Sequence, residues 1–279
     1  MVAQTRDRCV YHAGMAQENS HQQRDRVRER FTRTAEVFSS FVLTSRTADA
    51  ERLVEMAAPR DGECVLDVAC GPGTFALQFA PRVQTVVGLD VTPAILAQAR
   101  AAAVAAGATN LFFINGDSAA LPFAAGTFDI VCCGYSLHHM SDAAAALREF
   151  ARAVRRGGRV AVADMVVAPP GSFAVNNAIE QARDSSHVRT LLPEEFPSLV
   201  EAAGLRVSEC RTIVSPRSFK FWMSVGGWKP GEETYEATRR LMAQSIEGDT
   251  SGFHPLLAED GSGDIHFQQT TEYIVAEKT

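Results

Sequence analysis

The sequence predicts an α/β fold: a doubly wound, mostly parallel sheet with helices on both faces. Two patterns support this prediction. Short apolar segments alternate with helical segments along most of the chain, and the first apolar segment ends in a glycine turn that leads into a helix. A chain of 279 residues is long enough for one such domain with a substantial buried core.

The chain is expected to begin with a polar end followed by two helices. Residues 1–20 are predicted to form a flexible N-terminus. From about residue 21, apolar residues recur at three- to four-residue intervals, which predicts a helix, and a second helix is expected at 46–58. Residues 21–58 are therefore interpreted as an N-terminal helical cap within a single domain that covers 21–279.

The predicted core, residues 59–214, contains the alternating strands and helices. One helix begins at Thr92-Pro93, a hydroxyl cap followed by a first-turn proline, and ends before Gly107. The expected elements are strand 63–69, helix 73–81, strand 84–90, helix 92–106, strand 110–114, strand 128–134, helix 142–155, strand 158–166, helix 193–204 and strand 205–213.

A helical insertion is expected at 215–262, with an amphipathic helix near 233–246. The last strand occupies 263–279, where apolar and polar residues alternate from His266 to Glu277. Because the chain returns over the insertion like a hairpin, this seventh strand is predicted to run antiparallel to its neighbours.

The composition excludes several classes of partner. The charged fraction is 22% and the formal net charge is −6, so we expect no nucleic-acid surface. No apolar run approaches the roughly 20 residues that span a bilayer, and no signal-peptide core is visible, which predicts a cytoplasmic protein without a membrane span. The cysteines form no CxxC pair and are interpreted as reduced thiols, four of them in or beside buried strands. They are Cys9, Cys64, Cys70, Cys132, Cys133 and Cys210.

The glycine turn after the first strand predicts a nucleotide-type cofactor site. Gly71 and Gly73 allow a sharp turn and a close approach to a ligand, and Asp90 follows Gly71 at the spacing that reaches ribose hydroxyls. The pattern Gly71-x-Gly73-x-x-Ala76 also fits a dinucleotide site, so a nicotinamide oxidoreductase is one alternative. Asp67, however, would repel a pyrophosphate and suits a cationic ligand such as S-adenosylmethionine.

The chain resembles the class I S-adenosylmethionine-dependent methyltransferases over roughly residues 60–170, most of all the ubiquinone/menaquinone-biosynthesis branch. The motifs that carry the resemblance are VLDVACGPG, VVGLDVTPAIL, INGDSAALPF, FDIVCCGYSLHHM and LREFARAVRRGGRVAVADMV. Ala69 departs from the family, which usually has the first of three glycines there. The resemblance implies a Rossmann-like seven-stranded sheet on which the N-terminal helices and the insertion form a lid.

The resemblance also implies which residues hold S-adenosylmethionine. Asp90 would take the ribose hydroxyls, and Asp117 would meet the adenine amine. The remaining cofactor positions are Asp67, Ala69, Gly71 and Gly73 at the methionine end, Val91, Ser118 and Ala119 near the adenine, and Gly134 at the strand end where the methyl should lie.

His138 and His139 follow the strand 128–134, at the carboxyl edge of the sheet where ligands of doubly wound folds bind. A neutral imidazole can accept a proton during methyl transfer, so both are candidate catalytic bases; the alternative is that they only pack or hydrogen-bond. Adjacent histidines usually point apart and no further ligand cluster is apparent, so no metal site is predicted.

A polar cluster at 180–189 allows two interpretations. Asp184 could orient His187 as a base, or the segment could be a capped helix end with solvated charges, and the second is favoured. The acceptor pocket is expected to be partly aromatic. The candidate acceptor-binding residues are Phe31, Phe38, Tyr135, Arg183, His187 and Trp222.

These observations predict an enzyme that moves a methyl group to an O, N or C nucleophile of a partly apolar or aromatic small molecule, of the kind met in secondary metabolism. In-line displacement would leave S-adenosylhomocysteine. The alternatives are a protein that binds S-adenosylmethionine without methylating and, less favoured, an NAD(P)-dependent oxidoreductase. The sequence does not determine the oligomeric state; a homodimer is one option.

Overall fold

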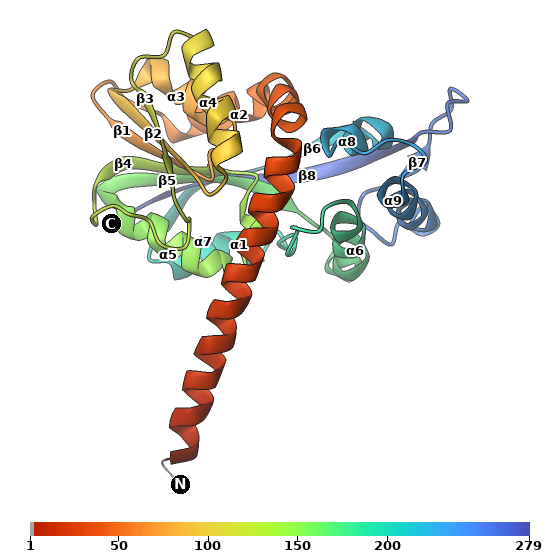
Figure 1. Ribbon diagram of the computed structural model, residues 1–279, viewed down its shortest axis with the longest axis horizontal. Coiled ribbons are helices and arrows are strands. Elements are labelled where there is room, and N and C mark those ends of the chain that lie inside the picture. Colours follow the sequence, from red (N-terminus) through yellow and green to blue (C-terminus); the bar gives the residue numbers. More distant parts are fainter. Residues whose placement is uncertain (1–2) are drawn as a thin grey trace.

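The computed structural model describes residues 3–279, with side chains from residue 20 onward apart from Pro170. Cys9 therefore lies outside the described side chains. Seven long strands and one two-residue strand form a single sheet in the order β3-β2-β1-β4-β5-β8-β6, with β7 paired to β8 (Figure 1). The strands are β1 Cys64–Val68, β2 Thr85–Asp90, β3 Leu111–Asn115, β4 Phe128–Gly134, β5 Val154–Val166, β6 Arg206–Ser218, β7 Leu256–Leu257 and β8 Ile265–Glu277.

The strand directions confirm the predicted fold class. β1 to β5 pair only in parallel with one another, whereas β8 runs antiparallel to both β5 and β6. The insertion starts later than expected, because β6 continues to Ser218 and pairs with β8 along its whole length. The short β7 is the one strand that the sequence pattern did not predict.

Helices cover both faces of this sheet. They are α1 Ala3–Ser45, α2 Thr47–Ala57, α3 Thr74–Phe79, α4 Pro93–Ala105, α5 Ala143–Ala153, α6 Phe173–Arg183, α7 Glu195–Ala202, α8 Phe219–Val225 and α9 Glu233–Gln244, with 3₁₀ turns at Ala80–Arg82, Leu137–His139 and Pro170–Ser172. The first helix differs from expectation, since it begins at Ala3 rather than near residue 21. Thr92 precedes α4 as predicted, but its hydroxyl makes no capping hydrogen bond.

The core consists of two layers, one on each face of the sheet. Val65 packs with α2 and α3 on one face, whereas Leu66 packs with α5 and α7 on the other, because successive side chains of a strand point to opposite faces. The insertion has a third cluster of its own, which includes Phe219, Trp222 and Phe267. This cluster holds α8 and α9 beside the start of β8.

The carboxyl ends of β1, β2, β4 and β5 meet at one edge of the sheet. α1 passes beside this edge and contacts both α4 and α8, so it connects the two sides of the molecule there (Figure 1). Within residues 3–279, no helix is both long enough and apolar enough to cross a membrane.

Candidate active site

A cavity of about 700 Å³ lies at the carboxyl edge of the sheet, within the range of about 300 to 1,000 Å³ that is usual for small-molecule pockets. Its wall combines the loops after β1, β2, β3 and β4 with side chains from α1, α6, α8, β6 and β8. Segments that are far apart in the chain therefore meet around one space.

The turn after β1 is shaped by backbone conformations that favour glycine. Gly71 has φ 54° and Gly73 has φ 89°. A Cβ at Gly71 would meet no other atom within 4 Å, so the backbone conformation rather than a lack of space favours glycine there. Ala69 shares the left-handed conformation with φ 53°, which costs a non-glycine residue roughly 1 to 2 kcal/mol. Gly134 is needed for another reason, because a Cβ there would lie 2.3 Å from the ring of Phe75.

Asp90 joins two of the loops around the cavity. Its Oδ2 accepts a hydrogen bond from the backbone N–H of Gly71 at 3.0 Å, and its Oδ1 accepts one from that of Thr92 at 2.8 Å. The carboxyl group lies on the cavity wall, and burial raises its pKa. Asp90 is thus placed to hold hydroxyl donors beside the glycine turn.

Asp117 lies on the same wall at the end of β3. Its Oδ1 accepts a hydrogen bond from the N–H of Ala119 at 2.9 Å, and Arg24 of α1 pairs with its Oδ2 at 3.4 Å. Helix α1 therefore covers this end of the cavity. The other expected cofactor residues on the wall are Ala69, Gly71, Val91, Ser118, Ala119 and Gly134.

Asp67 and Gly73, two further expected cofactor residues, do not line the cavity. The Asp67 side chain points beneath the glycine turn, where its Oδ2 accepts a hydrogen bond from the N–H of Ala76 and its Oδ1 one from the Cys132 thiol. Only 1% of Asp67 is exposed, and burial raises its pKa to about 7. Its influence on a ligand would be electrostatic rather than by contact.

His138 and His139 lie in the 3₁₀ turn after β4, and both line the cavity. Nδ1 of His138 lies 2.6 Å from Oδ1 of the buried Asp164, whose Oδ2 accepts the backbone N–H of His138 at 3.0 Å. A carboxylate can only accept, so Nδ1 carries the hydrogen and Nε2 is left as the basic atom. Nδ1 of His139 instead donates to the carbonyl oxygen of Ser186 at 3.0 Å.

The two histidines differ in basicity. Burial lowers the pKa of His138, but the charge and hydrogen bond of Asp164 outweigh it and leave the pKa above its usual value. Burial, followed by the charge of His138, lowers the pKa of His139 to about 4. At neutral pH His139 is therefore a neutral and weak base, whereas His138 is the stronger one.

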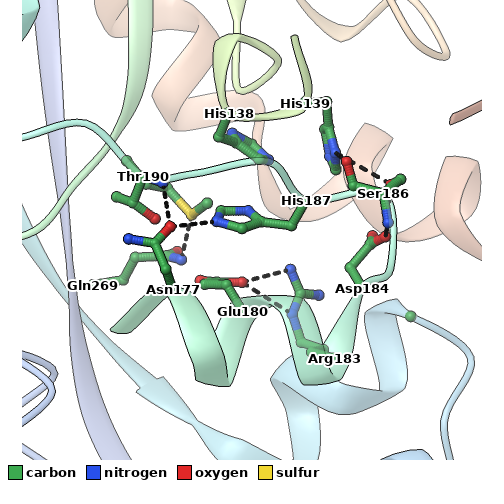
Figure 2. A network of polar contacts seen from close by, with 12 residues as sticks. His138, His139, Asn177, Glu180, Arg183, Asp184, Ser186, His187, Thr190 and Gln269 are labelled. Atoms are coloured by element: carbon green, nitrogen blue, oxygen red, sulfur yellow. Dashed lines mark hydrogen bonds and ion pairs between the residues drawn. The ribbon is translucent and has the colours of Figure 1, made fainter. Parts of the chain in front are cut away.

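Glu180, Asp184 and His187 of the polar cluster at 180–189 are buried rather than solvated, which corrects the favoured interpretation. Asp184 does not orient His187: its carboxylate accepts from the N–H and hydroxyl of Ser186, which lies beside it (Figure 2). The same carboxylate pairs with Arg30 of α1 at 3.4 Å. Nε2 of His187 lies 3.0 Å from Oδ1 of Asn177, and burial lowers the pKa of His187 to about 2. His187 lies outside the cavity wall.

The other expected acceptor-binding residues line the cavity. The ring of Phe31 packs edge-on against Phe38 at 4.9 Å and against His139 at 5.4 Å between centroids. The Arg183 guanidinium lies 4.3 Å from the ring centroid of Trp222. Helices α1 and α8 and the turn after β4 thus supply aromatic side chains to the cavity wall.

Several wall residues were not predicted, notably Gln23, Arg46, Met165, Arg217 and Gln269. Asp164, which orients His138, was also missed, although a carboxylate at the carboxyl end of a buried strand was a usable signal. Arg46 and Arg217 carry no such signal, because they are separated by 171 positions in the chain and meet only in the folded molecule.

Three cysteines lie in the core around the cavity, and one of them, Cys70, is on its wall. Cys70, Cys132 and Cys133 are free and buried, and burial raises the pKa of each thiol. Among the side chains that the structure describes, no three His, Cys, Asp or Glu residues are grouped so that they could hold a metal ion.

Comparison with known proteins extends this picture. A family model described as a methyltransferase domain matches residues 65–158. An uncharacterised methyltransferase of Bacillus subtilis, YcgJ, is 30% identical over 221 residues, which cover 79% of this chain and 87% of the relative. The crystal structure of YcgJ superimposes with a TM-score of 0.76 at 28% identity and covers 83% of this chain and 98% of its own.

Two further relatives are named for their acceptors. Aklanonic acid methyltransferase of Streptomyces sp. (strain C5) is 28% identical over 71% of this chain and 84% of the relative. Demethylmenaquinone methyltransferase of Thermus thermophilus is 36% identical over 44% of this chain and 57% of the relative. The coverage by YcgJ, together with the fold and the motif order, shows that the chain belongs to the class I S-adenosylmethionine-dependent methyltransferases.

Proposed function

We propose that this methyltransferase acts on a small-molecule acceptor with an apolar or aromatic part and methylates an O, N or C nucleophile by in-line displacement. One observation carries the proposal. The same cavity contains the glycine turn with Asp90, the His138 turn and a set of aromatic side chains. Cofactor, base and acceptor could therefore be brought together in one space.

The residues around the glycine turn fit S-adenosylmethionine, whose sulfonium supplies an activated methyl group. Asp90 would accept hydrogen bonds from the ribose hydroxyls, and Asp117 would accept one from the adenine amine. Asp67 lies close beneath the turn without a described basic partner, and a buried carboxylate of this kind favours a cationic ligand over a pyrophosphate. Ala69, Gly71 and Gly134 would let the ligand approach the backbone closely.

His138 is the better candidate base. Asp164 fixes its ring and leaves Nε2 free to take a proton from the acceptor, and a base is most effective when its pKa lies near the working pH. His139 is too weakly basic for this role and is better suited to pack against Phe31. A carbon or amine acceptor that is already nucleophilic would depend less on either residue.

The acceptor side of the cavity is apolar in part. Phe38, Tyr135 and Trp222 lie on its wall, and flat apolar walls favour an acceptor with an aromatic ring. Helices α1 and α8 lie over this region and would exclude water during the reaction. The names of the two relatives above, which refer to aklanonic acid and demethylmenaquinone, support a cyclic organic acceptor.

The cofactor assignment can be tested by calorimetric titration with S-adenosylhomocysteine. Asp90→Ala should weaken binding by about ten- to a hundredfold, because charge-assisted hydrogen bonds would be lost. Asp90→Asn, which keeps the side-chain shape, separates this effect from misfolding. Asp61→Ala, in an exposed turn, is the matched control and should bind like the wild type. Unchanged affinity in both Asp90 variants would contradict the assignment.

A further inference from the structure

We infer that the acceptor carries a carboxylate and that Arg217 binds it. This inference rests on the proposed function, since it names the chemical class of the acceptor: an aromatic carboxylic acid. On the cavity wall, the positive charges of the arginines outnumber the acidic side chains that pair with them.

Of the arginines on the cavity wall, Arg217 alone forms no ion pair with an acid among the side chains described in residues 20–279. Its two hydrogen bonds are long: Nε to Gln269 Oε1 at 3.5 Å and Nη1 to the carbonyl oxygen of Pro216 at 3.4 Å. The paired arginines are Arg24 with Asp117, Arg30 with Asp184, Arg46 with Asp49 and Arg183 with Glu180.

The surroundings of Arg217 are unfavourable for an unpaired cation. The side chain is half-buried, and burial together with the charge of Arg46 lowers its pKa. Burying a charge without a partner destabilises a protein, so such a charge normally has a binding role or an anionic partner. A ligand carboxylate would supply that partner, and the planar guanidinium matches it with two parallel hydrogen bonds.

The nearby carboxylate of Asp49 does not remove this imbalance, because it is already paired with Arg46. The Arg46 guanidinium lies 4.0 Å from the ring centroid of Tyr135 and pairs with Asp49 at 2.9 Å. The Tyr273 hydroxyl donates to Asp49 at 2.9 Å and lies 3.1 Å from the Tyr135 hydroxyl. This network keeps Asp49 beside Arg46, so Asp49 is not a direct partner of Arg217.

Arg217 lies away from the residues expected to hold the adenosine part of the cofactor, and calorimetry with an Arg217 variant separates an acceptor carboxylate from the methionine carboxylate of the cofactor. Arg217 lies on β6 and Gln269 on β8, beyond β5 in the sheet, whereas the glycine turn and Asp90 follow β1 and β2. The rings of Phe221 of α8 and Phe41 of α1 pack at an angle of 57° with their centroids 4.9 Å apart, and both line the cavity. A flat ring with a carboxylate would therefore match both the walls and the charge.

Calorimetry with two probes of equal shape tests this inference. With S-adenosylhomocysteine present at saturation, the protein would be titrated with 2-naphthoate and with 2-naphthamide, which differ in charge. We expect wild type to bind the acid at least about tenfold more tightly than the amide. Arg217→Gln should abolish this preference and Arg217→Lys should retain part of it. Arg211→Gln is the control, since Arg211 lies on the same strand but is exposed and paired with Glu209.

The outcomes separate this inference from the proposed function. Equal binding of acid and amide by wild type, or no binding of either, overturns the inference while leaving the cofactor site intact. If Arg217→Gln weakens S-adenosylhomocysteine as strongly as the acid, Arg217 serves the methionine carboxylate of the cofactor, and the inference is again wrong. If wild type fails to bind S-adenosylhomocysteine at all, the proposed function itself is contradicted.

Discussion

His138 and His139 are neighbours with the same side chain and opposite chemistry. The backbone of the 3₁₀ turn directs His138 to the carboxylate of Asp164 on β5 and His139 to the carbonyl oxygen of Ser186 after α6. A carboxylate stabilises the charged imidazolium, whereas the buried carbonyl environment does not compensate for lost hydration. The choice of partner therefore decides which histidine can act as a base near neutral pH.

The pH dependence of turnover should report this difference. A base must be unprotonated, so kcat should rise with pH through the raised pKa of His138, above 6.5. Asp164→Asn removes the charge that raises this pKa and should move the rising limb to lower pH. His138→Ala should reduce kcat by about a hundredfold or more, whereas His139→Ala should have a much smaller effect.

Initial rates of S-adenosylhomocysteine formation between pH 5.5 and 9, at saturating cofactor, provide the measurement. The comparison needs an acceptor that must lose a proton when it is methylated, such as a phenol. Equal kcat values for His138→Ala and wild type across this range would rule out His138 as the base.

At the scale of elements, α1 connects the two sides of the cavity. Its inner part carries Arg30, which pairs with Asp184, and Gln23, whose Nε2 donates to the carbonyl oxygens of His139 at 3.0 Å and Ser186 at 2.6 Å. These contacts tie the helix to the turn that holds the histidines. A lid role for α1 is a prediction that these contacts support.

Gln23→Ala should loosen α1. Two buried carbonyl oxygens lose a shared donor, which should lower the free energy of unfolding by about 1 to 3 kcal/mol. Gln22→Ala is the matched control, because Gln22 is the exposed neighbour on the same helix. Urea unfolding measures the stability, and the KM for the acceptor measures closure. The idea that α1 is held by Gln23 fails if the two variants behave alike in both assays.

At the scale of the whole molecule, ligand binding and stability are linked, because the cavity wall draws on most of the chain. A ligand that binds only the folded state adds RT ln(1 + [L]/Kd) to the free energy of unfolding, about 2.7 kcal/mol at a hundredfold excess over Kd. S-adenosylhomocysteine should therefore raise the melting temperature progressively with concentration. Thermal denaturation should show the same concentration-dependent shift for Asp61→Ala as for wild type. For Asp90→Ala, with binding ten- to a hundredfold weaker, the gain in the free energy of unfolding at the same concentration should fall to about 0.4 to 1.4 kcal/mol. A melting temperature that does not move with concentration in wild type would argue against a site in this cavity.

Local features of the fold could be predicted from the amino-acid sequence. The alternation of apolar and helical segments predicted each long strand, and the glycine turn with Asp90 at its fixed spacing predicted a ligand site at residues that do line the cavity. These patterns can be read because the partners lie within one strand, one turn or one βαβ unit. The boundaries were less certain, as β6 and α1 show, since pairing and packing extend an element beyond its own pattern.

Contacts between side chains that are distant in the chain could be identified only in the folded molecule. Asp184 pairs with Arg30 and Ser186 rather than with His187, and Asp164 orients His138. That Arg217 has no acidic partner among the side chains described in residues 20–279 is visible only in the folded chain, where the other arginines of the wall pair with acids. Pairings of this kind depend on the order of strands and on the path of α1 over the sheet, and no local period in the chain encodes them.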